Sequence, residues 1–327
     1  MSSTKFFGSK APSSSSDARV QLVHQLWPPE DTACCSDLDI VFFHGVRKPG
    51  ETDTWKNTWV QDTHAQEFWV KDWLPQDLDR NVRVLAMSYD SCAIKSKKEG
   101  NLKDIDDLAR VLLWSLVMGP WRLGQQCGCV LVGHSFGGLV IKSLVVEARK
   151  RNLYGVTNRL DEQDVVFANR FLQNLRGVVN YAVPHYGSFL ESYFTLGHKL
   201  YGRVKLAGFM KHLKPCTRWM ELSILFDVIS QENCIRVFAF LEGKPLKDVG
   251  KMMVEPASAQ RCAGRNYYLL EDCDHFTICK PVDKSHPSYQ LLVRFIKQCR
   301  QEVSDIDSMD PFVAFLFITN LLTCLIS

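Results

Sequence analysis

Short apolar runs recur along the chain and are separated by segments in which apolar residues have a helical spacing. The clearest strand pattern is Leu38-Asp-Ile-Val-Phe-Phe43, which ends in His44-Gly45. The clearest helical pattern starts at Asn101, places apolar residues three and four positions apart, and stops at Gly119-Pro120. Further strands are predicted at 19–27, 81–87, 127–132, 177–183, 235–241 and 266–270, and further helices at 139–150, 161–175 and 289–300.

The predicted strands alternate with helices along most of the chain. This order is typical of a mainly parallel sheet, because parallel neighbours need a crossover connection that is usually a helix. With 327 residues and 46% hydrophobic content, the chain is long enough to bury the core of one such domain. We therefore expect an α/β fold and assign it to residues 17–303.

Both ends of the chain differ in composition from this domain. Residues 1–16 are rich in serine and lack a continuous apolar stretch, so we expect a disordered tail and no secretory signal. The lack of acidic residues before Asp17 leaves a mitochondrial transit peptide as an alternative. Residues 304–327 form an acidic linker and an apolar tail that is shorter than the roughly 20 apolar residues of a spanning helix. A membrane anchor, packing on the domain and an isoform-specific end are all left open for this tail.

The charge and cysteine content argue against several classes of function. The chain has 39 basic and 36 acidic residues, and this balance does not favour nucleic-acid binding. The twelve cysteines have no Cys-x-x-Cys spacing and the histidines form no run, so we expect neither a metal site nor a disulfide framework. Reduced thiols in an intracellular compartment are the simpler interpretation.

The run Gly133-His-Ser-Phe-Gly-Gly138 lies between a predicted strand and a predicted helix. A serine at a strand-to-helix turn of the form Gly-x-Ser-x-Gly has a strained backbone that small neighbours permit, and its hydroxyl projects above the sheet. We therefore predict that Ser135 is the nucleophile of a hydrolase. The alternative is a glycine-rich turn whose serine caps the helix that follows.

The remaining members of a catalytic triad occur in the chain order of an α/β-hydrolase, which is nucleophile, acid, histidine. His275 follows the last predicted strand and is the expected base for the Ser135 proton. Glu242 ends the penultimate strand, where this fold places its acid. Glu255 in the next loop and Asp274 beside the histidine are the alternative acids. Each of these carboxylates would otherwise be a solvated surface charge.

Backbone amides are the candidates for stabilising the oxyanion of a tetrahedral intermediate. We expect the oxyanion hole to include Phe136, which follows the nucleophile, together with Gly45 and Val46 after the second strand. The alternative for His44-Gly45 is a tight strand exit with a structural histidine. In neither interpretation is His44 the base, and this chemistry needs no metal or organic cofactor.

Together these motifs resemble the serine-active-site-containing protein family of lipase-like α/β-hydrolases, with GPI inositol-deacylases as more distant relatives. The similarity covers about residues 37–298, and its motifs lie at 41–46, 73–77, 82–86, 132–140, 183–188 and 274–281. The resemblance implies an α/β-hydrolase fold in which Ser135 and His275 are the catalytic pair and Glu242 is a recurring glutamate. The chain departs from the family at Val183, where Ser or Thr is frequent, and at Ala257, where relatives often carry a carboxylate.

The resemblance also implies a glycerophospholipid substrate, because family members are linked to phosphatidylglycerol remodelling at contacts between mitochondria and the endoplasmic reticulum. Independent support comes from an insertion at 186–215 that combines aromatic and basic side chains, including Phe189, Tyr193, Lys199, Arg203 and Lys205. One interpretation is a helical cap that shelters an acyl chain and meets an anionic membrane surface. The other is a helix pair that packs on the sheet with a solvated basic face.

The sequence therefore predicts a serine carboxyl-ester hydrolase or acyltransferase that works through an acyl-enzyme. Its expected partners are a lipid or other acyl-ester substrate and a membrane surface. One alternative is a receptor or scaffold that keeps the fold without catalysis. The other is a thioesterase or peptidase, because those reactions use the same constellation on a different bond.

Overall fold

The computed structural model describes residues 22–29, 36–46, 51–61, 67–91, 104–154, 162–186, 217–247 and 250–308. The described strands are β1 (Val23–Trp27), β2 (Leu38–Phe43), β3 (Val82–Met87), β4 (Gly128–His134), β5 (Leu175–Tyr181), β6 (Arg236–Glu242) and β7 (Tyr267–Leu270). The described helices are α1 (Thr54–Asn57), α2 (Trp69–Asp72), α3 (Leu74–Asp77), α4 (Ile105–Leu113), α5 (Phe136–Tyr154), α6 (Glu162–Asn174), α9 (Thr217–Glu232), α10 (Pro256–Ala259) and α11 (Pro287–Ser308), with a π-helical segment at Trp114–Met118.

The strands form one seven-stranded sheet in the order β1-β3-β2-β4-β5-β6-β7. β1 is antiparallel to β3, and all the other neighbouring pairs are parallel. The predicted α/β fold with a mainly parallel sheet is therefore confirmed. The carboxyl ends of the parallel strands all lie at the same end of the sheet, so the loops after β2, β4, β5, β6 and β7 are on the same side of the molecule.

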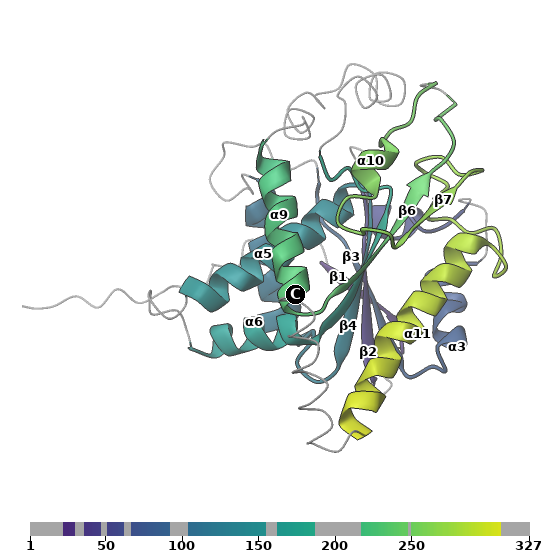
Figure 1. Ribbon diagram of the computed structural model, residues 1–327. Coiled ribbons are helices and arrows are strands. Elements are labelled where there is room, and N and C mark those ends of the chain that lie inside the picture. Colours follow the sequence, from purple (N-terminus) through teal and green to yellow (C-terminus); the bar gives the residue numbers. More distant parts are fainter. Residues whose placement is uncertain are drawn as a thin grey trace, which may run out of the picture.

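Helices cover both faces of the sheet (Figure 1). On one face lie α4, α5, α6 and α9, and on the other lie α11 and the short helices α1 to α3. Strand β2, next to the central strand β4, is buried throughout, and its alternate residues belong to different cores. Val41 and Phe43 pack in the first core, whereas Ile40 and Phe42 pack in the second, as the two-residue period of a strand requires.

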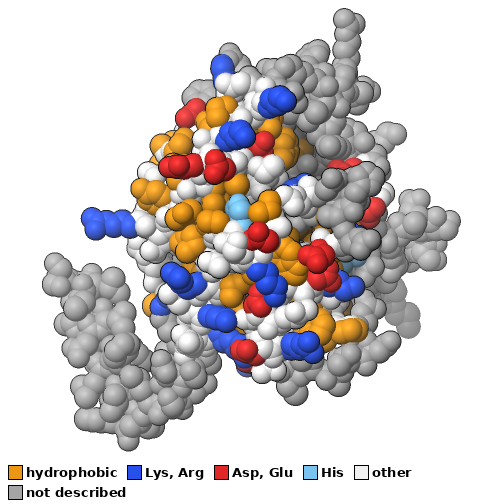
Figure 2. Space-filling view, turned by 90° about the vertical axis from the view of Figure 1, so that its right-hand side faces the viewer, with side chains coloured by type: hydrophobic (Ala, Val, Ile, Leu, Met, Phe, Trp, Pro, Cys, Tyr) orange, Lys and Arg blue, Asp and Glu red, His pale blue; other side chains and the backbone are white. Residues whose placement is uncertain are grey.

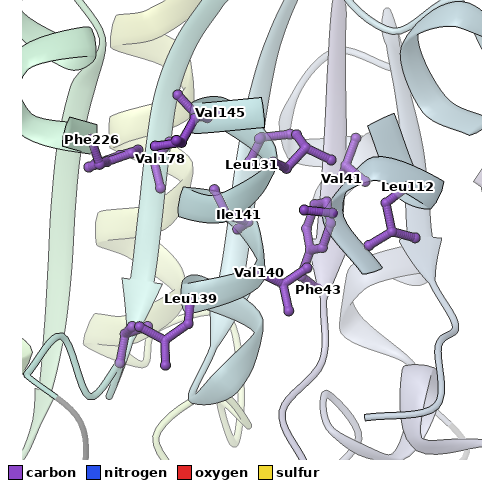
Figure 3. Close-up of a cluster of buried hydrophobic side chains, with 14 of the residues drawn as sticks. Val41, Phe43, Leu112, Leu131, Leu139, Val140, Ile141, Val145, Val178 and Phe226 are labelled. Atoms are coloured by element: carbon purple, nitrogen blue, oxygen red, sulfur yellow. The ribbon is translucent and has the colours of Figure 1, made fainter. Parts of the chain in front are cut away.

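Helix α5 is held against the middle of the sheet by large apolar side chains (Figure 3). Its residues Leu139, Val140, Ile141 and Val145 lie among side chains of neighbouring strands and helices, which include Val41, Phe43, Leu112, Leu131, Val178 and Phe226. All four of these α5 residues are buried. Since each such side chain contributes about 1.5–3 kcal/mol on burial, the position of the α5 N-terminus is firmly fixed.

Helix α9 is the one long described helix that the sequence patterns do not predict. Its buried residues, such as Trp219 and Phe226, are accompanied by exposed Met220, Ile224 and Val228. The helix is therefore apolar on its outer side as well, and it lacks the polar stripe that marks an amphipathic helix.

Strand β7 forms one edge of the sheet, and three of its residues, Tyr267, Tyr268 and Leu269, are exposed. Figure 2 views the molecule from this side and shows hydrophobic, acidic and basic side chains interspersed on it. Neither sign of charge dominates the visible surface, which agrees with the balanced composition of the chain.

Several sequence predictions fall on residues that the structure does not describe. These are the serine-rich tail, the insertion after Tyr186 and the apolar segment from 309 onward. Helix α11 continues through the first residues of the predicted acidic linker, as far as Ser308. Within the described ranges, no helix combines the length and apolar character that a bilayer crossing requires.

Candidate active site

Ser135 lies at the turn between β4 and α5 with a backbone φ of 53°. This left-handed conformation is strained for a residue with a side chain and persists only where its surroundings hold it. Here the Ser135 N–H donates to the carbonyl of Tyr181 in β5 at 2.9 Å, and its carbonyl accepts from the Gly138 N–H at 3.2 Å. The chain therefore has the strained strand-turn-helix geometry that the Gly-x-Ser-x-Gly motif predicts.

The glycines of this turn are required by close packing. A Cβ atom on Gly137 would lie 2.2 Å from the carbonyl oxygen of Phe43 in β2. A Cβ atom on Gly133 would lie 2.7 Å from the backbone nitrogen of Gly138. On Gly138 it would lie 2.3 Å from Val183, the residue at which this chain departs from the family pattern. The turn is thus wedged between β2 and the end of β5, and no side chain fits at these positions.

His275 lies in the loop after β7 and points at the serine. Its Nε2 is 2.9 Å from the Ser135 Oγ, and both residues are only 2% exposed. This is a hydrogen-bond distance, as a general base needs in order to take a proton from the hydroxyl. The structure therefore brings together the serine and histidine that the sequence predicts.

Of the three candidate acids, the structure places Glu242 beside the histidine. Glu242 is the last residue of β6, and its Oε2 is 3.7 Å from the Nδ1 of His275. The other carboxylate oxygen of Glu242 accepts a hydrogen bond from the Val254 N–H. Glu255 is exposed and precedes α10. Asp274 accepts from the backbone amides of the two residues after His275, at 3.0 and 2.9 Å, and so organises the turn that carries the histidine.

His134 also contacts the loop of His275, which the sequence motif does not reveal. Its Nε2 lies 2.7 Å from the carbonyl oxygen of His275. Because a carbonyl can only accept, this nitrogen carries a hydrogen. Burial and then the neighbouring His275 lower the pKa of His134 well below its usual value, so the ring is neutral near neutral pH. His134 thereby connects the turn at Ser135 to the backbone of the histidine loop.

The loop after β2 is fixed by His44, which stacks on Tyr89 with ring centroids 4.1 Å apart. The Tyr89 N–H donates to His44 Nε2 at 3.3 Å, so Nε2 is the acceptor. The other ring nitrogen, Nδ1, then carries the hydrogen and donates to the Gly45 carbonyl at 2.7 Å. Both ring nitrogens of His44 thus contact backbone groups, and the ring is fixed within this part of the structure.

The three residues expected to form the oxyanion hole all lie at or next to the turn at Ser135. Phe136 is the first residue of α5, where backbone amides and the helix dipole favour negative charge. A Cβ on Gly45 would lie 3.2 Å from the Cβ of Ser135, so this loop packs on the turn. Val46 follows it and packs against the first core. The predicted cap residues Phe189, Tyr193, Lys199, Arg203 and Lys205 lie outside the described residues.

The sheet order and the strand-turn-helix geometry at Ser135 define the fold as that of an α/β-hydrolase. A structure of phospholipase PlaB from Legionella pneumophila, in complex with thio-NAD, shares this fold with a TM-score of 0.52. The match has 14% sequence identity and covers 82% of this chain and 62% of that chain. A second structure of PlaB matches with a TM-score of 0.51 and 12% identity over 82% of this chain and 63% of that one.

At the level of sequence, the chain is similar to the SERAC1 proteins. It is 25% identical over 280 residues to SERAC1 of Danio rerio and 23% identical over 290 residues to SERAC1 of Homo sapiens. These alignments cover 79% and 84% of this chain but 38% and 41% of the two relatives, so the chain spans about two fifths of their length. No protein-family model matches the chain. SERAC1 proteins are thus homologues of this chain, and the family resemblance inferred from the motifs is confirmed.

Proposed function

We propose that the protein is a serine carboxyl-ester hydrolase or acyltransferase that works through an acyl-enzyme. The observation that carries this proposal is the 2.9 Å hydrogen bond between Ser135 Oγ and His275 Nε2. A buried serine-histidine pair at a strained turn has a direct chemical use, because the imidazole can take the hydroxyl proton while the oxygen attacks a carbonyl carbon.

In the proposed reaction, Ser135 Oγ attacks the ester carbonyl and its proton passes to Nε2 of His275. The imidazolium that forms presents its Nδ1–H to Glu242, whose negative charge stabilises the cation. Val254 holds the other oxygen of that carboxylate, and His134 holds the backbone of the histidine loop. His275 then gives the proton to the leaving alcohol, and water or another alcohol releases the acyl group through the same base.

Two backbone amides are the proposed donors to the oxyanion. One is the N–H of Phe136, at the N-terminus of α5. The other is the N–H of Val46, which belongs to the same planar trans peptide as the Gly45 carbonyl and therefore points to the opposite side from His44. His44 thus sets the orientation of this amide. Loss of one such donor typically costs about 100- to 1000-fold in rate.

The finer proposal is that the acyl group comes from a glycerophospholipid. It rests on the family resemblance of the motifs and on the homology to SERAC1. The fold is one on which a phospholipase, PlaB, is built. A membrane surface at mitochondria or the endoplasmic reticulum is part of the same proposal.

Hydrolysis by purified wild type and Ser135→Ala tests both levels of the proposal. We expect wild type to cleave p-nitrophenyl butyrate and to release fatty acid from phosphatidylglycerol vesicles, and Ser135→Ala to do neither at an unchanged Tm. Cleavage of the short ester alone would remove the phospholipid substrate and keep the chemistry. If folded wild type cleaves neither and fails to react with a fluorophosphonate, the protein is a receptor or scaffold.

A further inference from the structure

A second group of reactive side chains surrounds Lys142, a residue of α5 that lies about two helical turns beyond Ser135. Lys142 is only 1% exposed there. Its Nζ is 3.0 Å from the Sγ of Cys262 and 2.9 Å from the Oγ of Ser223 on α9. The ester chemistry proposed above uses none of these groups. A buried amine in contact with a thiol therefore needs a separate explanation.

Cys262 lies between α10 and β7 and combines strain with access. Its φ is 75°, in the left-handed region that is unfavourable for a residue with a side chain. Such strain often marks a functional position. The residue is partly exposed, so a small oxidant can reach it. Its thiol also shares a hydrogen bond with Asp227, which pairs with Arg261 at 3.0 Å. The sulfur is thus placed between an amine and a carboxylate.

The protonation of this pair favours attack by nitrogen on an oxidised sulfur. Burial lowers the pKa of the Lys142 amine, which raises the fraction that carries a free electron pair. Burial raises the pKa of the Cys262 thiol, and the positive charge of Lys142 opposes this only in part. The resting sulfur is therefore a thiol, and because the thiolate is the form that attacks peroxide, its proton has to leave first; Asp227 is placed to accept it.

We propose that Lys142 and Cys262 form a reversible covalent cross-link when the protein meets hydrogen peroxide. Peroxide first converts the thiol to a sulfenic acid and one water. The neutral amine of Lys142 then attacks the sulfur, so that an S–N bond forms and the S–O bond breaks. The hydroxyl leaves with one amine proton as a second water. The 3.0 Å separation lies within the range of about 3–3.5 Å for reacting atoms in a near-attack arrangement.

A dithiol reverses the reaction, because it returns two hydrogens to the sulfenamide and is itself oxidised to a disulfide. The cross-link joins α5, which follows the nucleophile, to the segment after α10. That segment begins beyond Val254, the residue that holds Glu242. The two linked residues are 120 positions apart, so the bond closes a long loop and should raise the Tm.

Peptide mapping of the full-length protein tests this proposal. Wild type is treated with hydrogen peroxide, its remaining thiols are alkylated, and it is digested with trypsin without reductant. We expect a species in which peptide 123–149, uncut at Lys142, is joined to peptide 262–265 with the loss of two hydrogens. Dithiothreitol before digestion should remove it. Lys142→Met and Cys262→Ser should not form it, and exposed Cys234 reports that the oxidant has acted.

Two results would overturn the proposal. In one, Cys262 is recovered as sulfinic or sulfonic acid while trypsin cuts after Lys142 as in untreated protein. In the other, Cys234 is fully oxidised while Cys262 is still alkylated. Both are read from wild type alone, so the proposal can be tested even if a variant fails to fold.

Discussion

Glutamine in place of Glu242 tests which carboxylate supports the histidine. Glu242 is 1% exposed, and its Oε2 lies 3.7 Å from His275 Nδ1. Glutamine keeps the size of the side chain and an oxygen that can accept from the Val254 N–H. It removes only the negative charge, so the imidazolium formed on His275 loses its counter-ion.

The size of the effect follows from the distance. Two unit charges 3.7 Å apart attract by about 4.5 kcal/mol at an effective dielectric constant of about 20. Since each 1.36 kcal/mol of barrier is a factor of ten, kcat should fall by about 10³-fold. KM should change little, because the cation forms only after the substrate has bound.

The assay is hydrolysis of p-nitrophenyl butyrate, with active sites counted by fluorophosphonate titration. Glu255→Gln and Asp274→Asn are the matched controls, and both should stay within about fivefold of wild type, since asparagine keeps an acceptor for the turn at 274. The reasoning is refuted if Glu242→Gln turns over within threefold of wild type at the same Tm. It is equally refuted if Glu255→Gln loses as much activity.

Three further predictions concern the surroundings of the site. His134→Phe should lower kcat about tenfold with KM unchanged, because it removes one hydrogen bond worth about 1–1.5 kcal/mol. His134→Gln keeps an N–H donor and should recover most of the lost kcat. Equal kcat in the two variants would contradict the positioning role of His134. Gly137→Ala should lower the Tm more than Gly264→Ala. The new Cβ at 137 would lie 2.2 Å from a carbonyl oxygen of β2, whereas Gly264 has open space around it and only an unfavourable φ of 58°. The reverse order of the two Tm values in a thermal melt would contradict the packing. Burial lowers the pKa of His134 and of His185 well below 6.5, so below that pH the unfolded chain binds more protons than the folded one. The free energy of unfolding should therefore fall as the pH drops below about 6.5, by up to ~1.4 kcal/mol per pH unit for each histidine, and urea titrations of His185→Gln should show a shallower fall than wild type.

The fold and the strained serine turn could be predicted because they depend on local patterns. The expected strands agree with the described ones to within two residues, apart from the start of the first, which lies outside the described residues. A buried strand, a glycine-flanked serine and a helix with an apolar face are all visible within about twenty residues. The signal fails for α9, whose exposed Met220 and Ile224 remove the polar side that marks a surface helix.

Other contacts of the candidate site could not be predicted with certainty from the sequence, because they depend on how distant segments meet. The sequence favours Glu242, which ends the penultimate predicted strand, but it leaves Glu255 and Asp274 open, because the choice depends on where the end of β6 meets the histidine loop. His134 reaches a carbonyl 141 positions away. Lys142 is of a residue type that usually faces solvent, yet it is buried, because every residue of α5 from Phe136 to Ala148 is buried.

The most direct test of the central claim is the position at which a fluorophosphonate attaches. Labelled wild type is digested with trypsin, and the label is located by fragmentation, with Ser135→Ala and His275→Asn treated in parallel. We expect the label on Ser135 within peptide 123–142, none on Ser135→Ala, and much slower labelling of His275→Asn. Label on another serine of the wild type, or equal labelling of folded Ser135→Ala, would contradict the assignment of Ser135 as the nucleophile.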